Sequence, residues 1–354
     1  MNLRSVRALS RRLNQNIPKL DAIILNAGIG GWTGLDWPRA VWNCLTDLVH
    51  QTTWPNFKLS EVGVTTTRQT TLPEEEPLGS VFCANVFGHY MLAHNLMPLL
   101  RRSGAPNGPG RIIWMSSVEA TTDHFNIEDI QAMRSRVPYE SSKTLTDLLA
   151  LTADLPSSTP FVSSFLSVDD PDDASTPRPS SGRTKELSFG PAPNTYLCHP
   201  GICGTSIVPL VFPLTYCMLA SFYLARWLGS PWHTISTYLA AISAVWLATS
   251  PQSELDGAEA PYREHGGGRS KWGSATGLFG DNYVANTEIE SWGFGGVAGS
   301  PILDRDATFR RKRGMKVATP ADRLHFEDLG RRCWQQLEEL RIRWEKLLDE
   351  EERS

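Results

Sequence analysis

Three short apolar segments, each followed by small polar residues, most constrain the fold of this chain. They are residues 20–25, 111–115 and 195–198. Helical patterns occupy residues 3–13, 81–100 and 139–151. Apolar runs of this length are typical of strands that are buried on both faces of a parallel sheet. Their alternation with helices predicts an α/β fold with a doubly wound parallel sheet.

Each apolar segment is followed by residues that could contact a ligand. Asn26-Ala27-Gly28 follows the first, Ser116-Ser117 the second and His199-Pro200-Gly201 the third. Ligands of doubly wound sheets bind at the carboxyl ends of the strands, so we expect these residues to face one crevice. A serine in this position is more often a turn or capping residue, so its chemistry depends on what lies beside it.

Tyr139 and Lys143 lie four residues apart in a predicted helix, which places both side chains on one face. A nearby ammonium favours the phenolate over the phenol. Because tyrosine has an ordinary pKa of about 10, a lowered pKa makes it a better proton donor near neutral pH. With 8 Tyr in the chain such spacing also arises by chance, and the serine strand upstream gives it weight.

The composition excludes several classes of protein. The chain has 354 residues, of which 41% are apolar and 20% charged, as in folded globular proteins. Its 34 basic and 38 acidic residues give a net charge of -4, so nucleic acid is an unexpected partner. The six cysteines lack metal-ligand spacing, and we expect reduced thiols. No secretory signal is predicted at the N-terminus.

Together these motifs resemble the short-chain dehydrogenase/reductase family. The family's NAG element, helix asparagine, serine strand, YxxxK pair and PGxxxT loop occur in order. They are Asn26-Ala27-Gly28, Asn85, residues 112–117, Tyr139 with Lys143, and Pro200 to Thr205. The family's glycine-rich turn, TGxxxGxG, does not precede Asn26. The resemblance therefore implies a Rossmann-like sheet that is missing its first strands and glycine-rich turn, which we interpret as N-terminal truncation.

The resemblance also implies roles for individual residues. Tyr139 would protonate the oxygen of a substrate carbonyl, and Ser117 would hold that carbonyl. We choose Ser117 over Ser116 because the second serine of such a pair usually has this role in the family. Lys143 would lower the tyrosine pKa and bind the nicotinamide ribose, and Asn85 would keep a water in a proton relay. Contacts with the cofactor would come from Asn26, Gly28, Tyr139, Lys143, Pro200, Gly201 and Thr205. No metal is expected.

A narrower resemblance, carried by residues 20–32, 85–90 and 202–233, is to the fungal 3-keto-steroid reductases of ergosterol biosynthesis. These are related to 17-beta-hydroxysteroid dehydrogenase type 7. The resemblance implies NADPH-dependent reduction of a 3-keto sterol to the 3-beta-hydroxy sterol during C-4 demethylation. It also implies the sterol C-4 methyl oxidase and C-3 dehydrogenase/decarboxylase as partners, at the cytosolic face of the endoplasmic reticulum membrane and lipid droplets. An inactive truncated homologue that acts as a scaffold, or a reductase of another keto-lipid, are the alternatives.

The chain is predicted to have four parts. Residues 1–155 form part of a dinucleotide-binding domain, and residues 156–194, rich in Pro, Ser and Asp, form a flexible insertion. Residues 195–300 complete the domain and include an apolar segment at 202–229. Residues 301–354 form an extension with an amphipathic helix.

Two segments suggest contact with a membrane. Residues 206–225 are uncharged and long enough to span a bilayer, although two prolines would break a straight helix. We expect partial insertion, with Arg226, Trp227 and Trp232 at the interface, and a buried substrate lid is the alternative. The basic run at residues 310–313 precedes the terminal helix. For that region we expect a solvated basic patch and a docked helix, with binding to an anionic membrane as the alternative.

Overall fold

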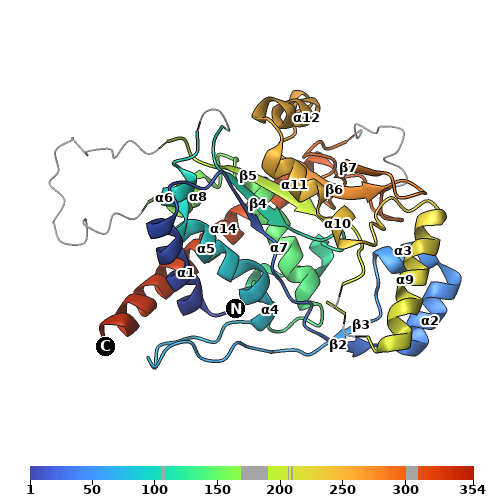
Figure 1. Cartoon of the computed structure of the whole chain (residues 1–354), viewed down its shortest axis with the longest axis horizontal. Helices are drawn as coiled ribbons and strands as arrows, with labels where there is room; N and C mark the ends of the chain where they lie inside the picture. The colour runs from blue at the N-terminus through green and yellow to red at the C-terminus, as the bar shows by residue number, and fades with distance from the viewer. Residues whose placement is uncertain (105–107, 169–189, 206, 209, 300–309) are drawn as a thin grey trace.

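A five-stranded sheet forms the centre of the protein (Figure 1). The computed structural model describes residues 1–104, 108–168, 190–205, 207–208, 210–299 and 310–354. The sheet has the order β1-β4-β5-β6-β7, made by β1 (Ala22–Leu25), β4 (Arg111–Met115), β5 (Asn194–His199), β6 (Lys271–Thr276) and β7 (Asn282–Thr287). The first four strands run parallel and β7 pairs antiparallel with β6. The predicted α/β fold is confirmed, and β1 lies at one edge of the described sheet.

Helices cover both faces of this sheet, as a doubly wound arrangement requires. One face, which includes Ile112 and Trp114, packs on a layer of helices that share its hydrophobic core. They include α1 (Leu3–Asn16), α5 (Gly88–Asn95), α7 (Pro138–Thr152) and α14 (Pro320–Arg353). The other face, with Ile113 and Met115, packs on α11 (Ile242–Thr249) and α12 (Gln252–Glu264). Consecutive residues of β4 thus enter different cores, because side chains alternate along a strand.

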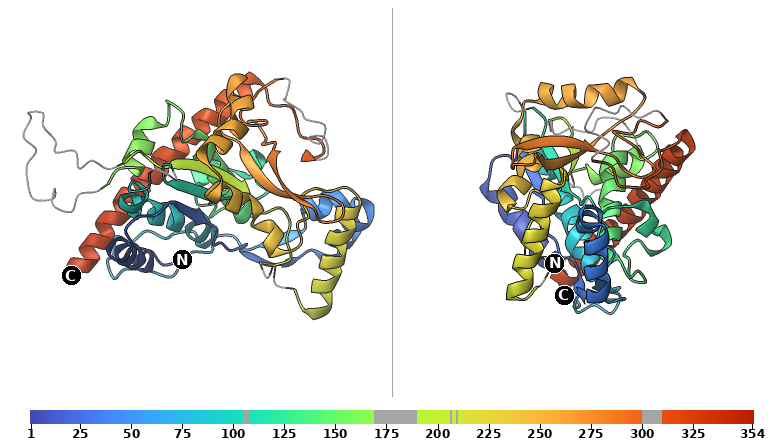
Figure 2. Two further views of the ribbon diagram at one scale, coloured as in Figure 1. Left: turned by 45° about the horizontal axis from the view of Figure 1, so that its top comes forward. Right: turned by 90° about the vertical axis from the view of Figure 1, so that its right-hand side faces the viewer.

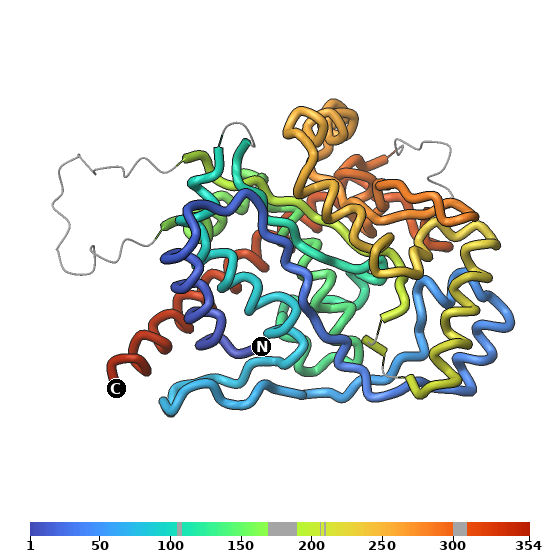
Figure 3. Tube along the Cα trace, viewed as in Figure 1, coloured from blue at the N-terminus to red at the C-terminus, as the bar shows by residue number. Residues whose placement is uncertain are grey.

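The C-terminal helix α14 docks on the domain, as the sequence predicts. A capping box formed by Thr319 and Asp322 begins the helix. Its Trp334 is buried and donates a hydrogen bond to the Leu149 carbonyl of α7 at 3.1 Å. At the far end, Arg7 of α1 forms an ion pair with Asp349. The first and last helices therefore lie side by side (Figure 3).

The basic run before α14 is partly paired with the domain. The Arg311 guanidinium lies 2.5 Å from the Glu288 carboxylate, and that of Arg313 lies 2.8 Å from the Asp47 carboxylate. The predicted solvated basic patch is therefore found only in part: Arg310 is buried and the Arg311 side chain is 28% exposed, whereas the Arg313 side chain is 75% exposed.

The predicted helix at 81–100 is interrupted. It consists of α4 (Ser80–Phe82), a π-helical turn (Cys83–Phe87), α5 and α6 (Met97–Leu100). Single π turns inside α-helices are frequently found at functional sites. Here the turn carries Asn85, which is completely enclosed by protein.

Elements that the sequence pattern did not predict gather at one end of the molecule (Figure 2). They are β2 (Trp32–Leu35), α2 (Trp37–Thr46), α3 (Leu48–Thr53), β3 (Lys58–Ser60), α9 (Phe212–Trp227) and α10 (Thr237–Ala240). β2 and β3 form a small antiparallel sheet of their own. The segment predicted to be a flexible insertion, residues 156–194, is ordered near its start. There it forms helix α8 (Thr159–Phe165), whose Val162 and Phe165 are buried. Residues 169–189 of that insertion lie outside the described residues.

The apolar segment after β5 forms a helix, α9, which is not broken by Pro213. Pro213 lies in the first turn of α9, where its missing N–H costs nothing and its fixed φ favours helix formation. Within the described part of the chain, every helix is too short or too polar to span a bilayer. Arg226 and Trp232 are buried, so two of the three residues predicted at a membrane interface do not reach the surface. Trp227 is more than half exposed.

Replacing Gly330 with alanine should destabilise the fold by about 1–3 kcal/mol, the usual cost of overpacking. The added Cβ would fall inside van der Waals contact with Thr152 of α7, a side chain held by its 2.7 Å hydrogen bond to the Leu148 carbonyl. The control is Gly257→Ala in α12, where a Cβ meets no atom within 4 Å. That change should be neutral or stabilising, by up to about 1 kcal/mol. Urea unfolding measures both, and a Gly330 variant as stable as the wild type would contradict the close packing.

Candidate active site

A large cavity lies where the parallel strands end. Its volume is about 1360 Å³, which exceeds the roughly 300–1,000 Å³ that is common for one small-molecule ligand. The cavity has room for two ligands side by side. Most of the residues predicted for the site line it, including all of those predicted to contact the cofactor. They are Asn26, Gly28, Ser117, Tyr139, Lys143, Pro200, Gly201 and Thr205.

Tyr139 lies in the first turn of α7, which begins at Pro138. Its ring is tilted against the Trp32 ring of β2, with 4.8 Å between the ring centroids. Burial raises the pKa of Tyr139 above its ordinary value, and the nearby Glu119 carboxylate adds to this effect. The nearby Ser117 hydroxyl opposes the increase. The structure therefore places on the wall of one cavity the two hydroxyls that the sequence predicts to act on a carbonyl.

Lys143 lies one turn further along α7, as the four-residue spacing predicts. Its ammonium donates a 2.8 Å hydrogen bond to the Met115 carbonyl at the end of β4 and lies 5.6 Å from the centre of the Tyr139 ring. Burial lowers the pKa of Lys143 to about 8, although the Asp147 carboxylate opposes the change. The expected lowering of the Tyr139 pKa by Lys143 is not seen in this arrangement, because burial and the Glu119 charge dominate. Spacing predicted the shared face but not the hydrogen-bond partner.

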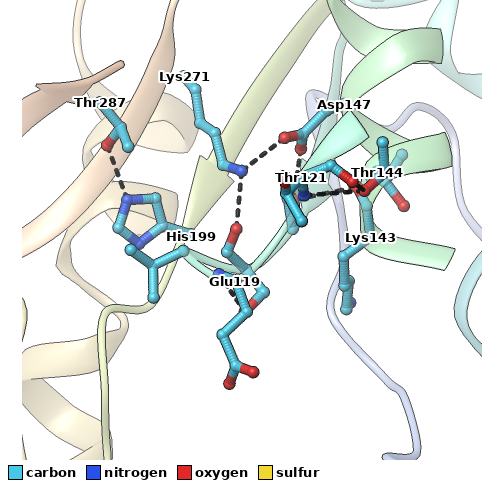
Figure 4. A network of polar contacts seen from close by, with 12 residues as sticks. Glu119, Thr121, Lys143, Thr144, Asp147, His199, Lys271 and Thr287 are labelled. Atoms are coloured by element: carbon cyan, nitrogen blue, oxygen red, sulfur yellow. Dashed lines mark hydrogen bonds and ion pairs between the residues drawn. The ribbon is translucent and has the colours of Figure 1, made fainter. Parts of the chain in front are cut away.

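A buried ion pair fixes the end of β4 (Figure 4). The Lys271 ammonium of β6 lies 2.6 Å from the Asp147 carboxylate of α7 and donates to the Ser117 carbonyl at 2.7 Å. The Ser116 hydroxyl donates to the other oxygen of Asp147. The Ser116 hydroxyl is thus engaged by Asp147, which agrees with the choice of Ser117 as the residue that meets substrate.

Asn85 holds the loop after β1 against the catalytic helix. Its amide nitrogen donates to the Ile29 carbonyl and to the Ser142 hydroxyl of α7, both at 3.0 Å. Its oxygen accepts the Ile29 N–H at 2.8 Å. Gly28 is required here, because a Cβ at this position would lie 2.8 Å from the Asn85 oxygen. The proton-relay role of Asn85 stays a prediction, and the contacts assign it a structural role as well.

The loop after β5 is shaped by a buried histidine. The Gly201 N–H donates to His199 Nδ1 at 3.1 Å, so the ring proton lies on Nε2, which donates to the Thr287 hydroxyl at 2.7 Å. Burial keeps the pKa of His199 well below its ordinary value, so the ring is neutral. Gly201 has φ +69° and no room for a Cβ beside the Trp232 carbonyl. These contacts direct the loop from Pro200 to Thr205 along the cavity.

Five residues of the site escaped the analysis of the sequence. They are Trp32, Lys58, Glu119, Asp147 and Lys271. The sequence could have indicated Asp147, because it follows Lys143 by four residues and so lies on the same face of the helix. Glu119 follows Ser117 by two residues, but no local pattern marks it. Trp32, Lys58 and Lys271 are brought to the site by contacts between segments that are distant in the chain.

The fold and the group formed by Ser117, Tyr139 and Lys143 define the class of protein, a reductase of the short-chain dehydrogenase/reductase type. No model of a known protein family matches the chain. The 3-keto-steroid reductase erg27 of Aspergillus fumigatus is 60% identical over 353 residues, which are 99% of this chain and 77% of that protein. The 3-keto-steroid reductase of Gibberella zeae is 39% identical over 346 residues, 95% of this chain and 69% of that protein. The chain therefore belongs to the family of fungal 3-keto-steroid reductases.

Substituting Gly28 with alanine should loosen the loop after β1. Displacement of Asn85 would remove the hydrogen bond that protects the Ile29 amide, so its exchange with solvent should become roughly 2- to 10-fold faster, as expected for the loss of one hydrogen bond. Gly34→Ala is the matched control, because a Cβ there meets no atom within 4 Å. Hydrogen–deuterium exchange followed by NMR measures both. Unchanged exchange at Ile29 would show that Asn85 does not depend on a glycine at position 28.

Proposed function

We propose that this protein reduces the ketone of a 3-keto sterol to the 3-beta-hydroxy sterol in ergosterol biosynthesis. The observation that carries the proposal is that Ser117, Tyr139 and Lys143 line the wall of one large cavity, in a chain 60% identical to a 3-keto-steroid reductase. The apolar side chains of α2 and α9 that line the cavity suit a sterol skeleton.

A nicotinamide cofactor agrees with a reductase of this fold, and we propose NADPH as the form used. The residues present fit such a group in one respect: Gly28 and Gly201 lie at strand ends on the cavity wall, where ligands of such sheets bind, and carry no side chain there. Backbone at these points can approach a ligand closely. Asn26, Gly28, Lys143, Pro200, Gly201 and Thr205 would contact the cofactor, which supplies the hydride when bound.

The chain's own residues supply the proton and the orientation. Tyr139 donates its phenolic proton to the substrate oxygen, and the Ser117 hydroxyl donates a hydrogen bond to that same oxygen. The raised pKa of Tyr139 keeps the phenol protonated until the oxygen becomes more basic. The Lys143 ammonium, on the same face of α7, favours the phenolate that remains. Burial of both groups excludes water and strengthens these interactions.

Replacing Tyr139 with phenylalanine should reduce kcat by at least about 100-fold, because general acid catalysis contributes roughly that much or more. Cofactor affinity should stay within about twofold, because the ring and its packing on Trp32 are kept. Oxidation of NADPH in the presence of a 3-keto sterol measures turnover, and fluorescence titration measures affinity. Tyr238→Phe, an exposed tyrosine of α10, is the control and should keep full activity. Equal turnover by the Tyr139 variant would remove this residue from the mechanism.

We also propose that α2 and α9 rest on a membrane surface. Their inner faces line the cavity, yet their outer faces expose large apolar side chains, including Leu45 and Phe212, which are 80% and 78% exposed. Helices that are apolar on both faces suit an apolar environment, and exposed patches of this kind mark interaction sites. A bilayer would give a water-insoluble sterol a path into the cavity. The endoplasmic reticulum, lipid droplets, sterol C-4 methyl oxidase and C-3 dehydrogenase/decarboxylase stay predictions from the resemblance.

The double substitution Leu45→Glu and Phe212→Glu should reduce cosedimentation with phosphatidylcholine vesicles by about tenfold or more. Burial of each large apolar side chain contributes about 1.5–3 kcal/mol, which a carboxylate would abolish. Leu324→Glu with Ile342→Glu on α14 is the control, since both side chains are exposed on another helix. Failure of the wild-type chain to bind vesicles, or equal loss in the control, would favour a substrate lid over a membrane surface.

A further inference from the structure

Lys58 of β3 reaches the site from a segment that carries none of the predicted catalytic residues. Its ammonium forms ion pairs with two carboxylates, those of Glu119 and Glu140, the latter at 2.6 Å. All three side chains are at most 13% exposed. The same ammonium lies 4.1 Å from the centre of a Trp32 ring and 5.4 Å from that of Tyr139. A single positive charge therefore binds both carboxylates and lies beside the rings of Trp32 and Tyr139.

The two carboxylates belong to the segments that carry the two hydroxyls. Glu119 follows Ser117 by two residues, and its N–H donates to the Ser117 hydroxyl at 3.2 Å. Glu140 is the neighbour of Tyr139 in the first turn of α7. Because Lys58 binds both carboxylates, it joins the end of β4 to the start of α7. The distance between Ser117 and Tyr139 thus depends on a bridge made by a third element.

The aromatic contacts give the bridge a second effect. Trp32 pairs with Ser60 across the small sheet, so Trp32 and Lys58 belong to one two-stranded unit. The ammonium over the Trp32 ring is a cation–π contact, worth more in a buried site than at the surface. Trp32 in turn packs on the Tyr139 ring. The small sheet therefore packs against the phenol ring through Trp32.

The charges of the cluster also act on the phenol. Glu119 and Glu140 both raise the pKa of Tyr139, after burial as the largest cause. Burial raises the pKa of Glu119 to about 7, while Lys58 opposes that increase. Without Lys58, two enclosed carboxylates would face each other and the phenol with no cation between them, an arrangement that proteins avoid because of its desolvation cost. The bridge is thus needed for the geometry and for the charge balance.

We propose that Lys58 is a positioning residue for the reduction, holding Ser117 and Tyr139 at the separation that one substrate oxygen needs. The ammonium does this by binding Glu119 and Glu140 and by keeping the Trp32 ring against the phenol. The inference rests on the proposed function of Ser117 and Tyr139. It assigns to the small β2–β3 sheet a part in catalysis, although neither strand belongs to the central sheet.

The kinetic test compares Lys58→Met with a variant of unchanged net charge. Lys58→Met should lower kcat by about 10- to 100-fold, the range expected for a small misplacement of reacting groups, with the KM for the sterol within about twofold. Lys58→Met with Glu119→Gln removes the bridge but keeps the net charge of the cluster, and it avoids leaving two unpaired buried carboxylates. It should show the same loss. Lys58→Arg should keep most activity, and Lys346→Met, on the exposed face of α14, should keep all of it.

A spectroscopic test does not depend on activity. In wild-type protein labelled with 13C-tyrosine, the Tyr139 ring signals, assigned by their absence in Tyr139→Phe, should be displaced by the ring current of Trp32. Both variants that lack the bridge should move these signals toward the values of exposed tyrosines, while Lys58→Arg and Lys346→Met should not. Unfolding curves measured in parallel show that each variant is folded.

The outcomes separate the two proposals. Wild-type protein without turnover of a 3-keto sterol contradicts the proposed function, and the tyrosine signals still show whether Lys58 holds Tyr139. Recovery of kcat in the charge-balanced double variant would overturn positioning, because charge alone would then explain the loss. Tyr139 signals that are unchanged by Lys58→Met would overturn it as well. Low kcat together with displaced signals in both variants supports it.

Discussion

The buried pair of Lys271 and Asp147 is the interaction on which the geometry of the site depends. Both side chains are 2% exposed, and the removal of two charges from water costs several kcal/mol unless contacts are close. Here the ammonium and the carboxylate are 2.6 Å apart. Asp147 also accepts a hydrogen bond from the Ser116 hydroxyl, and Lys271 also donates one to the Ser117 carbonyl, both at the end of β4. One ion pair therefore joins β6, α7 and β4. Both serines line the cavity, but the Ser116 hydroxyl is engaged by Asp147, which leaves the Ser117 hydroxyl to meet a ligand.

Helix α7 is held in the same way from the side of β1. Asn85 bonds to Ser142, whose hydroxyl donates to the Tyr139 carbonyl at 2.7 Å, and the same amide bonds to Ile29 after β1. His89 donates to the Asn85 carbonyl, and burial lowers the pKa of His89 to about 4, so that ring is neutral beside Lys143. The catalytic helix is thus fixed by polar contacts with both of its neighbours. A neutral histidine avoids a second cation next to Lys143.

The parts of this structure that follow from local pattern could be predicted, and those that follow from long-range contacts could not. Continuous apolar runs identify buried strands, because burial on both faces leaves no polar positions; β4 was predicted at its observed bounds. The four-residue spacing predicts that Tyr139 and Lys143 share one face of α7. The burial that raises the tyrosine pKa involves the Trp32 ring, which is 107 residues away in the sequence. Arg226 illustrates the same limit: as the lone charge of an apolar segment it indicated an interface, but its guanidinium donates to the His233 and Thr234 carbonyls inside the protein.

The cavity is polar at one end and apolar at the other, and this difference determines which ketone can react. At the strand ends the hydroxyls of Ser117 and Tyr139 can donate to a carbonyl, whereas α2 and α9 present apolar side chains such as Leu214 and Phe222. An enclosed carbonyl without a hydrogen-bond partner costs about 1–3 kcal/mol. A sterol 3-ketone has its one polar group at one end and an alkyl chain at the other, so only one orientation satisfies both ends. On the proposed function, we expect a ketone in the middle of the skeleton to meet apolar side chains instead of the hydroxyls of Ser117 and Tyr139. Preference for the 3-position would then follow from where polar and apolar groups line the cavity, without a separate recognition group for the rest of the molecule.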